Sequence, residues 1–137
     1  MTQLVCLSIG AHAGIGGHVA KRVAREGFHA GLASRRASQG VARLLGGVTA
    51  ARHAVNGFMG SAFADKGIEV LVEDVESNMG LLDVVVYKRG AQVGGRTLAD
   101  TSLKALGVGW WLATLGLPCV LRAHADGAWR NHAGPSL

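Results

Sequence analysis

The chain has 137 residues, a length that fits one domain with a single core of ordinary size. Hydrophobic residues make up 49% and charged residues 17%, which excludes a disordered chain, and 21 glycines without a Gly-X-Y period exclude collagen. The formal net charge of +5 favours anionic partners, and both a phosphate ligand and nucleic acid fit it. The two cysteines, Cys6 and Cys119, form no C-x-x-C pair, so we expect a reducing compartment.

Two stretches without charged residues, 1–20 and 105–121, raise the question of a membrane span. The first has no basic flank and is broken by glycine and histidine, so it fails as a signal peptide. The second is at the short limit for crossing a bilayer and contains Gly107, Gly109, Gly116 and Pro118. We therefore expect no membrane span and a cytoplasmic location.

A change of hydrophobic period marks the first strand and the first helix. Residues 4–9 form a short apolar run that ends in glycine, which predicts a buried parallel strand entering a tight turn. The next segment predicts an amphipathic helix ended by Gly27, because apolar side chains recur every four residues at Ile15, Val19 and Val23.

Three shorter elements are expected before residue 60. Residues 28–34 predict a second strand, and Ser38 is placed to cap a short helix over residues 38–45. A third strand is predicted at residues 49–55, with a turn at residues 56–57.

The second half of the chain begins with the sharpest helical pattern. Residues 68–79 carry one apolar stripe that stops at a glycine, and residues 81–87 form a nearly continuous apolar run typical of a strand covered on both faces. A last helix is predicted within residues 101–117, although glycines and Pro118 blur both of its ends. Strands and helices thus alternate, which predicts an α/β fold with a parallel sheet and right-handed crossovers.

Glycines gather where the first strand gives way to the first helix. Gly10, Gly14 and Gly16 lie in a loop that also contains His12 and Ile15. A pyrophosphate needs free backbone N–H groups and the positive end of a helix, and glycine lets the chain approach it without a Cβ in the way. The spacing predicts a nucleotide-binding loop, with a tight turn that binds nothing as the alternative. His12 either touches a phosphate of the nucleotide or faces solvent.

This loop resembles the Thr-Gly-x-x-x-Gly-x-Gly fingerprint of short-chain dehydrogenase/reductases, with Ile9 in the place of the threonine. Gly80-Leu81-Leu82-Asp83 is similar to the family's Gly-x-x-Asp approach to strand four, so the resemblance covers about residues 3–90. It implies a Rossmann-type, doubly wound parallel sheet, truncated after about four strands, in residues 1–121. Residues 122–137 would form an irregular C-terminal tail.

The resemblance also implies a nicotinamide dinucleotide and hydride transfer between a carbonyl and an alcohol. An acidic residue at the end of the second strand would bond the ribose hydroxyls, but this chain has Ser34, Arg35 and Arg36 there. An Arg fork offers charge-assisted bonds to a 2′-phosphate, which implies NADP in preference to NAD, with Arg35 as the main contact. A solvated arginine pair is the alternative. Gly90, the one residue kept from the family's Asn-Asn-Ala-Gly motif, completes the predicted cofactor site.

The family's catalytic pattern is missing. Its Tyr-x-x-x-Lys pair has no counterpart, because the only tyrosine, Tyr87, ends strand four and is followed four residues later by Ala91. The helical asparagine of the family falls near Ala113, and its aspartate after strand three falls near residues 62–63. We predict an NADP(H)-binding, oxidoreductase-like chain with an unknown small-molecule substrate and no catalytic residues. The alternative is a non-catalytic nucleotide-binding or protein-interaction module.

Other classes of partner are less well supported. The six histidines form no H-E-x-x-H or Cys/His spacing, so no metal site is expected. The arginines are scattered rather than clustered with aromatic residues, so no nucleic-acid binding is expected. No strand follows residues 81–87 to cover their far edge, and such an open apolar edge predicts a homo-oligomer that forms through this strand.

Overall fold

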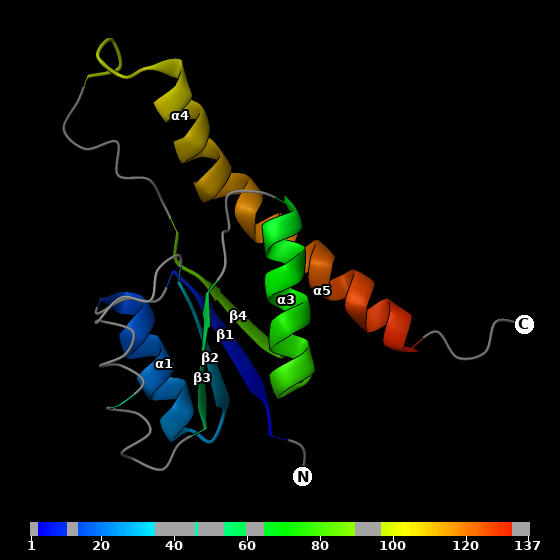
Figure 1. Cartoon of the computed structure of the whole chain (residues 1–137). Coiled ribbons are helices and arrows are strands. Elements are labelled where there is room, and N and C mark those ends of the chain that lie inside the picture. The colour runs from blue at the N-terminus through cyan, green and yellow to red at the C-terminus, as the bar shows by residue number, and fades with distance from the viewer. Residues whose placement is uncertain are drawn as a thin grey trace, which may run out of the picture.

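A single parallel sheet organises the molecule (Figure 1). The computed structural model describes residues 3–10, 14–34, 46, 54–59, 65–89 and 97–132, the last seven of these as backbone alone. Within these ranges the elements run in the order β1 (Val5–Ile9), α1 (Ile15–Arg25), β2 (His29–Ser34), β3 (Val55–Met59), α3 (Asp65–Met79), β4 (Val84–Tyr87), α4 (Leu103–Trp110), a π-helical turn η1 (Trp111–Leu115) and α5 (Gly116–His132).

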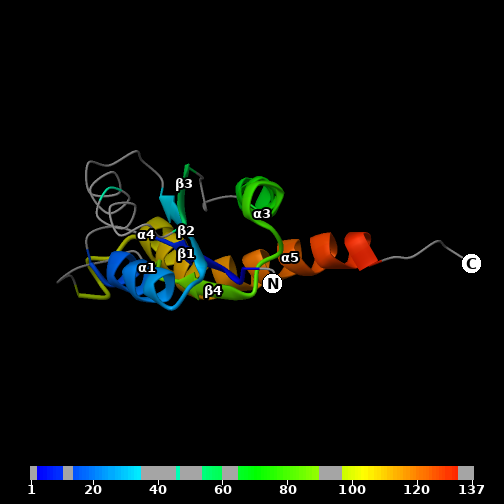
Figure 2. The same ribbon diagram turned by 90° about the horizontal axis from the view of Figure 1, so that it is seen from below.

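The four described strands pair in parallel in the order β3-β2-β1-β4. Helix α1 covers one face of the sheet, and α3 and α5 lie next to each other on the other, as the view from below shows (Figure 2). The α/β, doubly wound architecture expected from the sequence is therefore confirmed. Gly80, which has φ +105°, ends α3 where the apolar stripe stops, and Gly27, with φ +91°, follows α1.

The larger part of the core lies between the sheet and α3. Leu7 and Ile9 of β1 pack there with Ile68 and Val75 of α3, and Val120 of α5 closes the cluster. Gly31 of β2 lets α3 come close, since a Cβ there would lie 3.2 Å from both Leu7 and Met79. The stripe predicted on residues 68–79 is thus the buried face of α3.

Helix α1 packs on the sheet through its smallest residues. Gly16, Gly17, Ala20 and Ala24 are buried, whereas Ile15 is 61% exposed. The prediction that Ile15 belongs to the apolar face is wrong, because small side chains bring the helix axis close to the strands and leave Ile15 beyond the contact.

The strand predicted at residues 49–55 lies mostly outside the described residues and overlaps the described strand β3 only at Val55. Strand β3 spans Val55–Met59, so residues 56–57 belong to the strand and do not form a turn. The pairing with β2 explains why no turn forms there: the Asn56 Oδ1 accepts a hydrogen bond from His29 Nε2 at 2.9 Å, and Phe58 is buried beside Ala33. Tertiary pairing overrides the local Asn-Gly turn signal. The predicted helix over residues 38–45 lies outside the described residues.

The C-terminal helix is longer than predicted. It begins after Ser102, whose hydroxyl accepts the Ala105 N–H at 3.2 Å, and it continues past Pro118 to His132. The predicted range of residues 101–117 is therefore too short, and the irregular tail predicted for residues 122–137 is wrong for residues 122–132, whereas residues 133–137 lie outside the described residues. A proline inside a helix has no N–H and its ring crowds the carbonyl four residues before it, here that of Thr114, which lies within the wide π turn.

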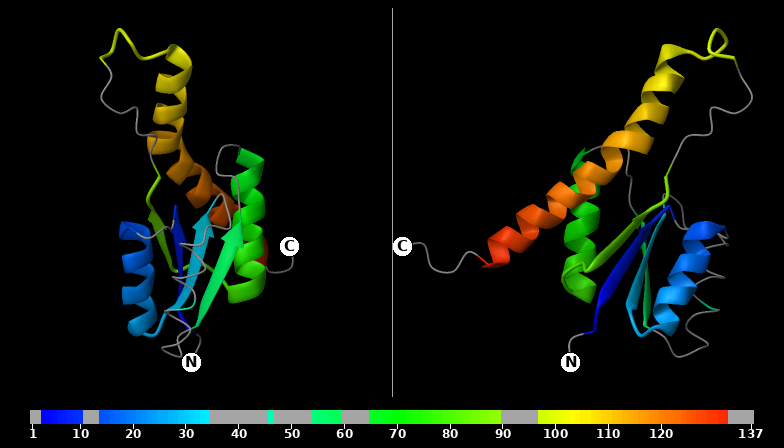
Figure 3. Two further views of the ribbon diagram at one scale, coloured as in Figure 1. Left: turned by 60° about the vertical axis from the view of Figure 1, so that its left-hand side comes forward. Right: turned by 180° about the vertical axis from the view of Figure 1, so that it is seen from behind.

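Much of this helix is apolar and exposed. Leu103–Ala125, with 23 residues, is long and apolar enough to cross a membrane: it contains an 18-residue window with a mean hydropathy of 1.4, and only 17% of that window is buried. Helix α4 extends away from the carboxyl edge of the sheet, and α5 continues the same helix past α3, which it contacts (Figure 3). Composition alone does not decide whether such a helix spans a membrane, so the absence of a span stays a prediction.

Strand β4 forms one edge of the described sheet, where it pairs with β1. Its residues are half-buried and Val84 is 39% exposed, so the strand is not covered on both faces as its apolar run predicted. The open edge itself was expected from the sequence.

Candidate functional site

The carboxyl ends of three strands meet at one edge of the sheet. The Gly10 N–H, just after β1, donates to the Ala33 carbonyl of β2 at 2.9 Å. The Lys88 N–H, just after β4, donates to the Ile9 carbonyl at 2.9 Å. The turn that leaves β1 is therefore fixed from both sides, with Ser34 at the end of β2 beside it. In open α/β sheets, ligands bind in the crevice outside this edge.

Gly10 is required at this turn for two reasons. Its φ of +86° lies in the left-handed region, which side chains rarely adopt. A Cβ at this position would also overlap with the Lys88 carbonyl oxygen and lie 3.0 Å from Arg89 Cγ. The backbone is thus packed where only glycine fits, as the nucleotide-loop hypothesis expects.

Helix α1 begins directly after this turn and presents a bare N-terminus. Its N-cap residue, Gly14, offers no side-chain hydrogen bond, and the first turn contains no acidic residue. The buried hydroxyl of Ser8 donates to the Gly16 carbonyl at 3.3 Å, which ties this turn of the helix to β1. Uncapped N–H groups and the helix dipole make such an end suited to an anion.

Two cations lie beside the glycine turn and were not predicted as site residues. Lys88 is exposed, and the stem of half-buried Arg89 reaches the space next to Gly10. The parallel register pairs Ile9 with Tyr87, so the residues that follow both strands are neighbours. If the pairing of β1 with β4 had been assumed, the sequence would have placed Lys88 and Arg89 beside Gly10. A basic pair at this edge favours a phosphate-bearing ligand.

Asp83 anchors the start of β4. Its Oδ2 accepts the Val5 N–H at 2.7 Å, and its own N–H donates to the Val5 carbonyl at 3.0 Å. The aspartate noted in the sequence therefore joins β1 to the start of β4 at the end opposite the glycine turn, where it has a structural role.

Tyr87 faces the C-terminal helix. Its hydroxyl donates to the Leu112 carbonyl at 2.8 Å. Burial raises the pKa of the Tyr87 phenol, with the nearby Cys119 adding to the rise and Arg89 opposing it. A tyrosine that keeps its proton and donates a hydrogen bond to a helix carbonyl is poorly suited to exchange protons with a substrate.

Several predicted site residues lie outside the described part of the chain: His12, Arg35, Arg36 and Gly90. The structure brings together Gly10, Gly14, Gly16 and Ser34 at one edge of the sheet, with Ile15 exposed next to them. Among the described residues, no group of three or more potential metal ligands occurs. His18 and His124 illustrate this, since each bonds within the protein, to the Gly14 carbonyl and to Glu76 respectively.

Comparison with known proteins identifies solved structures that share this architecture. No protein-family model matches the chain, and no curated protein matches it in sequence. Solved structures do match. A short-chain dehydrogenase/reductase from Burkholderia xenovorans has a TM-score of 0.83 at 21% identity over 95% of this chain and 53% of its own. An enzyme of the same type from Mycobacterium marinum has a TM-score of 0.84 at 18% identity over 96% and 52%.

A metagenomic short-chain oxidoreductase in complex with NADP also matches, with a TM-score of 0.82 and 17% identity over 93% of this chain and 57% of its own. The chain has the Rossmann-type fold of short-chain dehydrogenase/reductases. It spans about half the length of the structures that it matches. The fold expected from the glycine loop and the Gly-x-x-Asp segment is therefore confirmed, with four parallel strands in the described part of the chain.

Proposed function

We propose that this chain binds NADP(H) at the carboxyl edge of its sheet, as an oxidoreductase-like domain of the short-chain type. The residues proposed to line the cofactor are Gly10, His12, Gly14, Ile15, Gly16, Ser34, Arg35, Arg36 and Gly90. Arg35 and Arg36 would bond the 2′-phosphate, and the glycine loop would meet the pyrophosphate.

The single observation that carries this proposal is the turn at Gly10. The backbone there excludes a Cβ and leads into a helix without a side-chain cap or an early acidic residue. A turn that served only to reverse the chain would not require an uncapped, acid-free helix end beside it. The NADP complex of the metagenomic neighbour supports a nicotinamide dinucleotide as the ligand.

Calorimetric titration of the purified chain with NADPH, and separately with NADH, tests the proposal. We expect saturable binding that favours NADPH, and a loss of about tenfold in NADPH affinity in Arg35→Ala, because a charged hydrogen bond is worth about 1.5–3 kcal/mol. Arg22→Ala is the matched control, since Arg22 is 77% exposed on α1 and pairs with Glu26. Absence of binding to a chain shown by circular dichroism to be folded would contradict the proposal. Equal losses in both variants would point to net charge alone.

Hydride transfer in this family would need an acid–base pair that this sequence does not contain. The Tyr-x-x-x-Lys pair is missing from the sequence, and the hydroxyl of Tyr87 is directed to a helix carbonyl. We expect no turnover of NADPH with mixed small carbonyl substrates. The chain would then act as a nucleotide-binding module, which we expect in the cytoplasm. Turnover that Tyr87→Phe abolishes would contradict this expectation.

A second candidate function, protein interaction, is favoured by the edge position of β4. In the described part of the sheet this strand pairs on one side, with β1, and Val84 is 39% exposed. We propose that two copies associate through the strand predicted at residues 81–87, because an open edge offers unpaired N–H and C=O groups. A strictly monomeric chain at micromolar concentration in analytical ultracentrifugation would contradict this. Val84→Lys should produce that monomer, since a lysine on an edge strand opposes pairing.

A further inference from the structure

The long C-terminal helix changes its hydrogen-bond pattern beside Tyr87. The Gly116 N–H donates to the Trp111 carbonyl, five residues back, and so bypasses the Leu112 carbonyl that an α-helix would use. The Leu112 carbonyl instead accepts the Tyr87 hydroxyl at 2.8 Å. Leu112 is only 4% exposed, so a donor from the protein takes the place of water there.

Gly116 allows Tyr87 to reach this carbonyl. A Cβ on Gly116 would overlap with the Tyr87 hydroxyl oxygen and lie 2.6 Å from its Cζ. Gly116 is buried, and the Tyr87 ring packs against the main core cluster. Tyr87, Leu112 and Gly116 therefore form one interlocking contact, which we call the Tyr87 lock.

The two halves of the helix on either side of the lock are held very differently. Helix α5 is fixed to α3, because Val120 and Ala123 belong to the core and His124 Nδ1 lies 2.6 Å from Glu76 Oε1. Helix α4 has no buried residue at all among Leu103–Trp110. Any change of register at the π turn would therefore rotate α4 and leave α5 in place.

We propose that Tyr87 is a positioning residue that sets the rotation of α4 relative to the body of the molecule. Its hydroxyl keeps the π turn open by occupying the Leu112 carbonyl. Without that donor, the Gly116 N–H returns to Leu112, the turn closes to α geometry, and α4 rotates by one residue, or about 100°.

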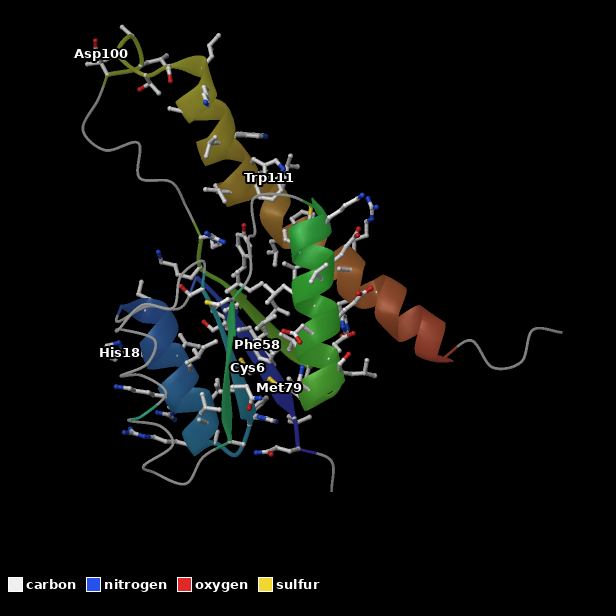
Figure 4. All side chains as sticks on the ribbon, viewed as in Figure 1. Cys6, His18, Phe58, Met79, Asp100 and Trp111 are labelled. Carbon is white, nitrogen blue, oxygen red and sulfur yellow. The ribbon has the colours of Figure 1, made fainter. Side chains whose placement is uncertain are left out.

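This rotation has a defined consequence for the tryptophans. Trp111 lies where the helix leaves the body of the molecule and packs against the core cluster, whereas Trp110 is 64% exposed (Figure 4). Closing the turn moves Trp111 toward the exposed position that Trp110 now holds. Tyr87 directly precedes Lys88, whose N–H bonds the residue before the glycine turn. The carboxyl end of β4 would therefore position both the proposed nucleotide-binding edge of the sheet and the exposed face of α4.

Fluorescence of a single tryptophan tests the lock. In a Trp110→Phe, Trp129→Phe background of the full chain, only Trp111 emits. We expect Tyr87→Phe to shift its emission to longer wavelength and to increase quenching by acrylamide. Ser102→Ala is the control, because it removes the cap of α4 and leaves the lock intact, and it should not shift the emission. Unchanged emission in a folded Tyr87→Phe chain would overturn the proposal.

A double-mutant cycle provides a second test that does not depend on tryptophan. Gly116→Ala should lower the urea midpoint strongly when Tyr87 is present, and clearly less in a Tyr87→Ala background, where the space beside Gly116 is open. Equal falls of the midpoint in the two backgrounds would show that Tyr87 and Gly116 are independent, and the lock would be rejected.

Discussion

Helices α1 and α4 contrast in a way that separates composition from burial. Helix α1 buries small residues, Gly16, Gly17, Ala20 and Ala24, and packs against β1 and β2. Helix α4 is the more apolar of the two, yet none of its residues is buried, and Leu103 is 85% exposed. Packing against a neighbouring surface therefore depends on how closely a helix can approach that surface. An apolar sequence does not by itself bury the helix.

The candidate nucleotide edge belongs to the well-packed region, and the Tyr87 lock joins it to the exposed one. Consequently, substitutions near β1 should lower the free energy of unfolding strongly, and substitutions on α4 should change it very little. Four measurements can sharpen or break this contrast.

The largest difference is expected between two leucine truncations. Leu7→Ala removes a side chain with 0% exposure from the centre of the core and should lower the free energy of unfolding by about 2–5 kcal/mol. Leu103→Ala removes one that is 85% exposed and should change it by about 0.5 kcal/mol or less. Urea denaturation followed by circular dichroism measures both. A comparable loss in Leu103→Ala would show that α4 is packed against a partner in solution.

Two glycines with a positive φ angle allow the effect of steric overlap to be separated from the effect of backbone strain. Gly27→Ala should cost about 1–2 kcal/mol, because Gly27 has φ +91° and nothing lies near its missing Cβ. Gly10→Ala should cost about 3 kcal/mol, since its Cβ would overlap with the Lys88 carbonyl oxygen in addition to the strain. Equal costs in urea denaturation would mean that the turn after β1 is more open than the structure shows.

The anchor of α5 should have an intermediate effect. The His124–Glu76 contact of 2.6 Å joins α5 to α3, and its two side chains are 29% and 12% exposed. A cycle of His124→Ala, Glu76→Ala and the double variant should give a coupling of about 1 kcal/mol. Arg22 and Glu26, at 77% and 57% exposed, supply a control pair whose coupling should be smaller. If the control pair couples as strongly, the buried anchor has no special role.

The sequence predicted those elements whose pattern is repeated within the element itself. The stripe of α3 and the strand–glycine–helix succession at Gly10 need no knowledge of neighbours. The turn predicted at residues 56–57 was wrong because these residues pair with β2, although the local Asn-Gly signal points to a turn. The helix past Pro118 was missed because a π turn, held by a tyrosine from another element, adjusts the backbone before the proline.

The candidate site divides in the same way. Gly10, Gly14 and Gly16 were found from spacing, because the requirement for glycine arises within a few residues of chain. Arg89 was missed because its position beside Gly10 arises from the register of β1 with β4, across 79 residues of sequence. Residues that gain a role only through strand pairing become visible once the sheet order is known.

A pH dependence of the free energy of unfolding should also originate in the well-packed region. Cys6 is 1% exposed in β1, among the residues of the sheet that Figure 4 labels, and burial raises the pKa of its thiol. Above pH 9.0, the ordinary thiol value, the unfolded chain releases this proton while the folded chain keeps it. Fewer protons are then bound in the unfolded state, so the free energy of unfolding falls as the pH rises.

Cys6→Ala isolates this contribution, because every other group titrates alike in both chains. Urea denaturation between pH 8 and 10.5 should show a steeper fall for the parent chain than for Cys6→Ala, by at most about 1.4 kcal/mol per pH unit for one proton. Parallel slopes would mean that the Cys6 thiol ionises as readily in the folded chain as in the unfolded one. Cys6 would then be open to water, and the contrast between a closed sheet and an exposed α4 would fail at its most buried strand.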